Sequence, residues 1–251
     1  MALLQDVNRL LDAPTVDAVW THLLARMQSY GFGRLLYACT RAQTGNRLGA
    51  PENALMLTNH SKEYLDRFIG DGLYRDAPMV RWANENRGVC NWRCIDEMVK
   101  TGTVTPAEKQ VIAFNRRHGL TAGLTISFTA LAVRSKGGIG LVAREGLTHD
   151  DVDAIWQAHG EEILALCRIA HLRIICLPHP QAGNMLSPRQ REALEWVAEG
   201  KTTLDIAVLM GVSAATVEKH LRLARESLEV ESTAQAIAKA TMMNQIFTVE
   251  T

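Results

Sequence analysis

Residues 186–202, near the C-terminus, read LSPRQREALEWVAEGKT and carry the strongest structural pattern of this chain. It continues with IAVLMGVS at residues 206–213 and TVEKHLRLAR at residues 216–225. Apolar residues recur at helical spacing within these segments, and glycines separate them. The pattern predicts a small all-helical unit with a tight turn between its second and third helices.

The predicted helix ends carry specific capping residues. Ser187-Pro-Arg-Gln190 forms a capping box with proline in the first turn, and Gly200 ends the first helix. Thr202 or Thr203 caps the second helix, and residues 211–213 form the turn, in which the serine caps the third helix. A third helix over about 213–228 and a fourth over about 232–245 complete the unit.

The apolar positions of these helices predict one shared core. The side chains expected in it are Leu194, Trp196, Val197, Ile206, Leu209, Val217, Leu221, Ala224 and Leu228.

This unit resembles the helix-turn-helix output domain that LuxR-type and NarL-type transcription regulators share. The resemblance implies that the third helix enters the major groove of double-stranded DNA. It also implies that Glu218, Lys219 and Arg222 face base edges or nearby phosphates. By their chemistry, Arg222 can pair with a guanine edge and Glu218 can accept a bond from a cytosine amino group. The full set of DNA-facing residues expected on this basis is Lys201, Thr202, Thr216, Glu218, Lys219 and Arg222. For Glu218 and Lys219 a plain solvated helix face is the alternative. The fourth helix matches a dimer contact of the family, or is a further core helix.

Composition limits the class of protein. The chain has 251 residues and a formal net charge of zero, so DNA binding has to rest on a few placed cations, helix N-termini and pairing of two chains. The N-terminus starts an amphipathic helix rather than a signal peptide, and no run of about 18 apolar residues exists to span a bilayer. We expect a soluble, cytoplasmic protein that does not engage membranes.

The N-terminal part alternates helical and strand patterns, which predicts a short antiparallel sheet with helices on both sides. Helices are expected at 2–12, 16–30, 61–69, from Ala77-Pro78 through Trp82, 105–118 and 149–175; strands are expected at 34–41, 54–58, 122–130 and 137–144. The class is α+β, with an N-terminal α/β/α sandwich similar to PAS or GAF sensors. We predict a sensor domain at residues 1–176, a linker with two prolines at 177–185, and the helix-turn-helix domain at 186–246.

The sensor part resembles the autoinducer-binding domain of LuxR-type quorum-sensing receptors. A receiver domain is excluded because no strand delivers an aspartate at its C-terminal end. The family carries a Trp and, four residues later, a Tyr; an Asp-Pro pair, a Trp and a Gly follow at fixed spacing. Those positions read Tyr64, Phe68, Ala77-Pro78, Trp92 and Gly123 here. The resemblance implies an acyl-homoserine lactone or a related small hydrophobic signal as ligand.

The departures from the family fall on its polar ligand contacts. Tyr64 keeps a hydroxyl that can donate, Phe68 has no polar atom, and Ala77 cannot accept a bond from a ligand amide, although Asp76 is adjacent. An unpaired buried amide costs about 1–3 kcal/mol. The ligand-binding residues expected are Tyr64, Phe68, Asp76, Ala77, Pro78, Trp82, Trp92 and Gly123. Core packing of these aromatic residues, without a ligand, is the alternative.

Other motifs carry less. The five cysteines are Cys39, Cys90, Cys94, Cys167 and Cys176, whose odd number and scatter argue against a disulfide framework. The spacing of Cys90 and Cys94 hints at a metal or redox site, but a lone pair lacks two further ligands for zinc. No catalytic constellation, phosphate loop or cofactor motif stands out, so we expect no enzyme, no bound metal and no cofactor beyond the signal.

Together these patterns predict a homodimeric regulator that binds a roughly palindromic DNA site under control of a small-molecule signal. Two alternatives stay open. One is a ligand-independent regulator whose pocket is filled by its own side chains, and the other is an anti-regulator that forms mixed dimers.

Overall fold

The structure is a computed structural model that describes residues 2–40, 54–128, 136–178 and 185–247. The chain divides into two compact units: the first comprises Met1–Ala13 and Asp17–Arg173, and the second comprises Pro14–Val16 and Ile174–Thr251. Of the predicted linker, residues 179–184 lie outside the described residues. None of the described helices is both long enough and apolar enough to span a membrane.

The N-terminal unit is built on one antiparallel sheet with the strand order β2-β1-β5-β4-β3. Its strands are β1 (Phe32–Thr40), β2 (Ala54–Thr58), β3 (Gly88–Asn91), β4 (Gly123–Ser127) and β5 (Lys136–Ala143). Strand β4 is buried at every position, and β1 and β5 have buried residues alternating mostly with partly buried ones. Both faces of the sheet are therefore covered, which requires a layer of helices on each side.

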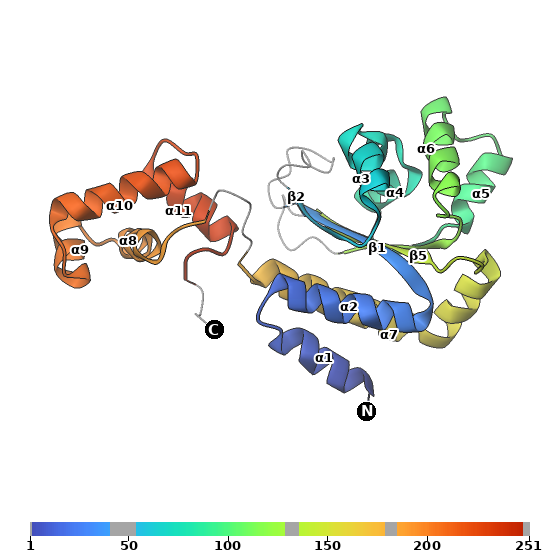
Figure 1. Cartoon of the computed structure of the whole chain (residues 1–251), viewed down its shortest axis with the longest axis horizontal. Helices are drawn as coiled ribbons and strands as arrows, with labels where there is room; N and C mark the ends of the chain where they lie inside the picture. The colour runs from blue at the N-terminus through green and yellow to red at the C-terminus, as the bar shows by residue number, and fades with distance from the viewer. Residues whose placement is uncertain (1, 41–53, 129–135, 179–184, 248–251) are drawn as a thin grey trace. The chain divides into compact units, whose positions relative to one another are not determined.

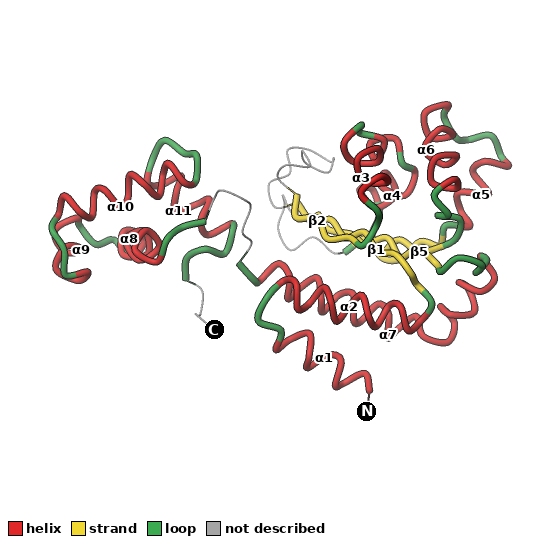
Figure 2. The backbone as a smooth tube through the Cα atoms, in the orientation of Figure 1, coloured by secondary structure: helices red, strands yellow, loops and turns green. Residues whose placement is uncertain are grey.

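Helices cover both faces of this sheet (Figure 1). One layer contains α1 (Ala2–Asp12), α2 (Val16–Tyr30) and α7 (His149–Cys176). The other contains α3 (Lys62–Leu65), a π-helical turn η2 (Asp66–Gly70), a 3-10 turn η3 (Leu73–Asp76), α4 (Pro78–Glu85), α5 (Arg93–Lys100) and α6 (Pro106–Arg117). Figure 2 shows the strands as a single layer between the two groups of helices. The predicted α/β/α sandwich is confirmed.

Capping residues fix where two of the sensor helices begin. The Thr105 hydroxyl accepts a bond from the backbone N–H of Glu108, and the Glu108 carboxylate accepts one from the backbone N–H of Thr105, which forms a capping box at the start of α6. The buried Glu108 also pairs with Arg81 of α4 at 2.8 Å. Thr148 and Asp151 cap α7 reciprocally in the same way.

The sequence prediction missed strand β3, helix α5 and the 3-10 turn η3, whereas the helix expected over 61–69 is present. Strand β3 has only four residues without apolar alternation, and α5 begins at Trp92 without a side-chain cap, so neither carries a strong local signal. The helix expected over 61–69 changes to a π turn at Asp66. The strand expected over 122–130 spans Gly123–Ser127 in the structure. Residues 129–135 lie outside the described residues.

The C-terminal unit consists of α8 (Pro188–Ala198), α9 (Thr203–Met210), α10 (Ala214–Ser227) and α11 (Thr233–Met242). Ser187 and Gln190 form the predicted capping box of α8, and Thr202, rather than Thr203, caps α9. Gly211 ends α9 in the left-handed conformation with φ of 68°, and Ser213 caps α10. The four-helix prediction for this unit is confirmed.

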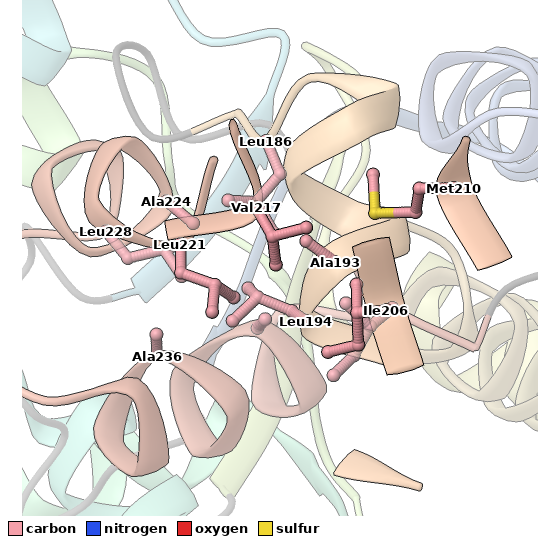
Figure 3. Packing of buried hydrophobic residues seen from close by; sticks show 12 residues of the cluster. Leu186, Ala193, Leu194, Ile206, Met210, Val217, Leu221, Ala224, Leu228 and Ala236 are labelled. Atoms are coloured by element: carbon pink, nitrogen blue, oxygen red, sulfur yellow. The ribbon is translucent and has the colours of Figure 1, made fainter. Parts of the chain in front are cut away.

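One core holds these four helices together (Figure 3). Its fully buried members include Leu194, Ile206, Val217, Leu221, Ala224 and Leu228, as predicted. The expectation for Leu209 was wrong: its side chain is 50% exposed, and Met210, at 6%, takes the inward position at the end of α9. Trp196 and Val197 are only partly buried at the edge of the core.

Gly123→Ala tests how closely the sheet and the wall of helices approach in the N-terminal unit. An added Cβ would lie 2.3 Å from the carbonyl oxygen of Leu141 and 3.1 Å from the ring of Trp92. We expect the free energy of unfolding of this unit to fall by about 3 kcal/mol, measured by urea denaturation. Gly70→Ala is the control, since a Cβ there meets no heavy atom within 4 Å. Equal midpoints for the two variants would contradict this packing.

Candidate functional site

The residues at the middle of one face of the sheet are small, and we call this surface the glycine floor. Successive residues of a strand point to opposite faces, so Gly138 and Gly140 share one face of β5 while Ile139 and Leu141 share the other. Gly138 pairs across the strands with Ala38, and Gly140 pairs with Thr125. The middle of this face therefore has almost no side-chain volume, which leaves space between the sheet and the helices above it.

That space is a cavity of about 140 Å³. Its apolar walls are Leu36, Tyr64, Phe68, Met79, Val80, Trp92, Ile95, Ile112, Leu120 and Val142. These residues come from β1, β5, α3, η2, α4, α5 with the preceding Trp92, and α6 with the following Leu120, so the cavity depends on the whole outer layer of helices.

The structure brings most of the predicted ligand-binding residues to this cavity. Those that line it are Tyr64, Phe68, Ala77, Pro78 and Trp92. The other three do not belong to the lining. Asp76 is exposed on η3, Trp82 is half-buried on α4, and Gly123 lies behind the ring of Trp92.

The polar groups at the family positions are engaged within the protein. The Tyr64 hydroxyl donates to Asn115 Oδ1 at 3.0 Å, and the indole N–H of Trp92 donates to Thr125 Oγ1 at 2.8 Å. Burial raises the pKa of Tyr64, so its hydroxyl stays neutral. A ligand that uses these groups has to share them with their present partners.

Two residues that the sequence analysis did not single out as ligand contacts offer free polar atoms at the cavity. His60 and Asn84 both line it, and within the described part of the chain neither His60 Nδ1 nor Asn84 Oδ1 has a hydrogen-bond partner although both atoms are buried. His60 stacks on Tyr64 with ring centroids 4.6 Å apart. A single histidine or asparagine has no spacing signal, so only the fold reveals them.

The environment of His60 keeps its ring uncharged. Burial, followed by the nearby positive charge of Arg34, lowers the pKa of His60 to about 4. A neutral imidazole has one N–H donor and one acceptor nitrogen. His60 can therefore give and take one hydrogen bond with a bound molecule.

The charged residues of the cavity lining have partners of their own. Asp96 pairs with Arg116 at 2.8 Å and with His149 at 3.1 Å, and Lys136 donates to the carbonyl oxygen of Asn86 at 3.0 Å. No group of three or more His, Cys, Asp or Glu side chains in the described ranges is placed to hold a metal ion. These features suit an uncharged, largely apolar molecule.

The second candidate site is the outer face of α10. Its inner face is buried through Val217 and Leu221, whereas Glu218, Lys219 and Arg222 are exposed. The three predicted base-reading residues thus share one exposed helix surface, as the spacing predicts.

The polar contacts of this face leave some of its cations available. Arg222 pairs only with Glu226 one turn along the same exposed helix surface, and Lys219 makes no ion pair with any described residue. Glu218 Oε1 accepts a bond from the Thr203 hydroxyl at 3.0 Å, which ties α10 to the start of α9. Exposed pairs of this kind are weak, so a phosphate or a base edge can replace them.

The remaining predicted DNA contacts lie at helix starts. Lys201 is exposed just before α9, and the Thr202 hydroxyl is engaged with Asp205 at 2.7 Å in a capping box. Hydrogen bonds from Thr202 lower the pKa of Asp205, which keeps the cap charged and formed. Thr216 lies in the first turn of α10, where its hydroxyl meets Ser213 at 2.9 Å.

An α/β/α unit with an apolar cavity, joined in one chain to a capped helix-turn-helix with an exposed third helix, defines a signal-responsive transcription regulator. Comparison with protein families supports this class. The model described as "Autoinducer binding domain" matches residues 15–174, and the model described as "Bacterial regulatory proteins, luxR family" matches residues 184–240. The chain belongs to the LuxR family of quorum-sensing transcription regulators, which are DNA-binding proteins rather than enzymes.

Individual proteins are also similar to this chain in sequence or in structure. The transcriptional activator protein LuxR of Aliivibrio fischeri is 24% identical over 76% of this chain and 74% of its own length. ExpR of Dickeya dadantii is 21% identical over 92% of this chain and 91% of its own. Among solved structures, Escherichia coli SdiA has a TM-score of 0.55 at 18% identity, covering 98% of both chains. CepR2 of Burkholderia cenocepacia has a TM-score of 0.52 at 18% identity, covering 69% of this chain and 93% of its own.

The depressed pKa of His60 predicts an acid-sensitive sensor. Between its ordinary pKa near 6.5 and its folded pKa of about 4, the unfolded chain binds more protons than the folded one. The free energy of unfolding therefore decreases as the pH falls through this window, by at most about 1.4 kcal/mol per pH unit from this group. Urea denaturation at pH 7 and pH 5 measures the effect, and His60→Phe should reduce the difference. An unchanged difference in that variant would show that other groups cause it.

Proposed function

We propose that the cavity binds an uncharged amphiphile with an acyl chain, an acyl-homoserine lactone or a variant of it. The observation that carries this proposal is an apolar cavity lined by His60 and Asn84, whose buried Nδ1 and Oδ1 atoms have no hydrogen-bond partner among the described residues. Buried polar groups are nearly always hydrogen-bonded in folded proteins. A ligand that offers both an acceptor and a donor, as an amide-linked lactone does, would satisfy them.

This assignment moves the polar contacts away from the family positions. Ala77 and Phe68 supply only apolar surface, and Tyr64 and Trp92 already donate to Asn115 and Thr125. His60 and Asn84 are then the groups that orient the polar end of the signal, and the glycine floor accepts the chain. CepR2, which shares this fold, is described as N-acylhomoserine lactone dependent, which supports the same ligand class here.

The self-filled alternative has less support. Filling the cavity from within needs bulky side chains on the sheet, but the middle of its floor is Ala38, Gly138 and Gly140. Ordinary cores leave few voids larger than a water molecule. An open cavity with orphaned polar atoms is therefore better explained by a ligand.

We further propose that the protein binds promoter DNA as a homodimer in the cytoplasm. The net charge of zero gives little long-range attraction to DNA, so two copies of α10 on two half-sites supply the affinity. A two-fold dimer requires a roughly palindromic operator. Within each copy, Arg222 and Lys219 read or approach the bases while Lys201 and Thr216 position the helix on phosphates. The signal shifts the population toward the DNA-competent form through its higher affinity for that form.

His60→Phe tests the ligand assignment. The change keeps the stacking on Tyr64 but removes an unpaired buried nitrogen, so the melting temperature without ligand should stay the same or rise. The affinity for the best member of an N-acyl-homoserine lactone panel, measured from its thermal stabilisation, should fall on the order of tenfold.

His118→Phe is the matched control. His118 contacts Tyr64 edge-on with ring centroids 5.5 Å apart but does not belong to the cavity lining. The assignment fails if the His60 variant binds as tightly as the wild type, or if both variants lose affinity equally.

Arg222→Ala tests the DNA-facing helix. Loss of a bidentate base contact removes about 1–3 kcal/mol in each half-site, so specific promoter binding by a dimer should fall by more than tenfold in a gel-shift titration. Arg189→Ala is matched to it, since both arginines are exposed and pair with a glutamate on their own helix. The helix assignment is wrong if the two variants bind promoter DNA with equal affinity and intact fold.

A further inference from the structure

Two cysteines meet beside the cavity. Cys90 is the next-to-last residue of β3, and Cys94 lies in the first turn of α5. Their sulfur atoms are 3.2 Å apart. Both side chains are half-buried, so small solutes reach them. Bond formation needs a separation of about 2.0 Å, which requires an approach of roughly 1 Å.

The local chemistry makes the two thiols unequal. The hydrogen bond between the two thiols, in which either sulfur can be the donor, and the backbone N–H groups of Cys94 and Ile95 lower the pKa of Cys94, although burial and the charge of Glu97 act against them. The same thiol–thiol hydrogen bond and burial raise the pKa of Cys90. Because Cys94 lies in the first turn of α5, where backbone N–H groups stabilise a thiolate, we assign Cys94 as the nucleophile and Cys90 as the thiol that attacks second.

We propose that Cys90 and Cys94 form an oxidisable dithiol that a peroxide converts into a disulfide, and that this bridge constrains the cavity wall at Trp92. The Cys94 thiolate attacks one peroxide oxygen, the O–O bond breaks, and Cys94 becomes a sulfenic acid as hydroxide leaves. The Cys90 sulfur then attacks the Cys94 sulfur and displaces the sulfenic oxygen as water. Overall, two thiols and one hydrogen peroxide give one disulfide and two waters.

The bridge links the redox state to the cavity through the segment it closes. Trp92 lies between the two cysteines and its ring is a wall of the cavity. The residues on either side of it are held by α7, because Asn91 donates to Asp153 at 2.6 Å and Arg93 donates to the same carboxylate at 2.8 Å. A disulfide that closes the loop of residues 90–94 therefore restricts the position of Trp92, whose two neighbours are already held by α7.

The other cysteines offer internal comparisons. Cys39 and Cys167 are buried, and burial raises the pKa of Cys167 to about 12, so its thiolate is suppressed. Cys176 is exposed but has no second thiol beside it in the described chain. A general sensitivity of cysteines to peroxide would show first at Cys176.

Peptide mapping of the full-length protein tests the proposal directly. Trypsin cuts after Arg87, Arg93 and Lys100, so the two cysteines fall on separate peptides, 88–93 and 94–100. After treatment with hydrogen peroxide and blocking of free thiols, we expect these two peptides to appear joined and to separate on reduction. Cys94→Ser should abolish both the linkage and the oxidation, whereas Cys90→Ser should stop at a Cys94 sulfenic acid that dimedone traps.

Cys176→Ser is the matched control and should leave the linkage unchanged. The proposal is overturned if peroxide oxidises Cys176 before any linked 88–93 and 94–100 peptides form, or if Cys90→Ser yields no trapped sulfenic acid.

A second readout tests the connection to the cavity, which rests on the proposed function. The thermal stabilisation by N-octanoyl-homoserine lactone should differ between the reduced and the oxidised protein, and this difference should vanish in Cys90→Ser. Equal stabilisation in both redox states would overturn the coupling. If the lactone stabilises neither state, the ligand class fails, while the peptide linkage still decides the dithiol.

Discussion

The cavity of the N-terminal unit depends on the absence of side chains from one face of β5. On the face toward α7, the strand carries the buried side chains of Ile139 and Leu141. On the face toward the cavity, positions 138 and 140 are both glycine. The helices above the sheet approach it at Trp92, whose ring lies over Gly123 and Gly140, and at the end of α4, where the Ala83 carbonyl oxygen accepts a bond from Ser127 of β4. This one-sided arrangement leaves a cavity in a fold that otherwise packs densely.

The output unit follows a different principle, since its helices are defined at their ends. Reciprocal caps begin α8, α9 and α11, and a left-handed glycine turns the chain from α9 into α10. Because the caps and the core fix α10 on one side, its exposed side is free to carry function. The exposed side has few cations, and of these Arg222 already pairs with Glu226, so the surface suits a DNA contact that requires correct pairing of groups rather than general charge attraction.

The sequence allowed prediction of the features that leave local marks. The caps at Ser187 and Ser213, and the periodic core of α10, all appear where the pattern places them. The order of strands, the short β3 and the cavity depend on long-range pairing, which no local pattern encodes. His60 and Asn84 become candidates only when the fold shows that their buried atoms lack partners, and the contact of Cys90 with Cys94 needs the turn from β3 into α5.

We propose that a small molecule in the cavity controls a DNA-binding dimer. Native mass spectrometry can test this with the full chain, expressed with and without an N-acyl-homoserine lactone supply and then mixed with promoter DNA. We expect one retained signal molecule per chain and two chains on each DNA duplex, with much less complex when the signal is withheld. Chains that bind the duplex equally well with an empty cavity would contradict it.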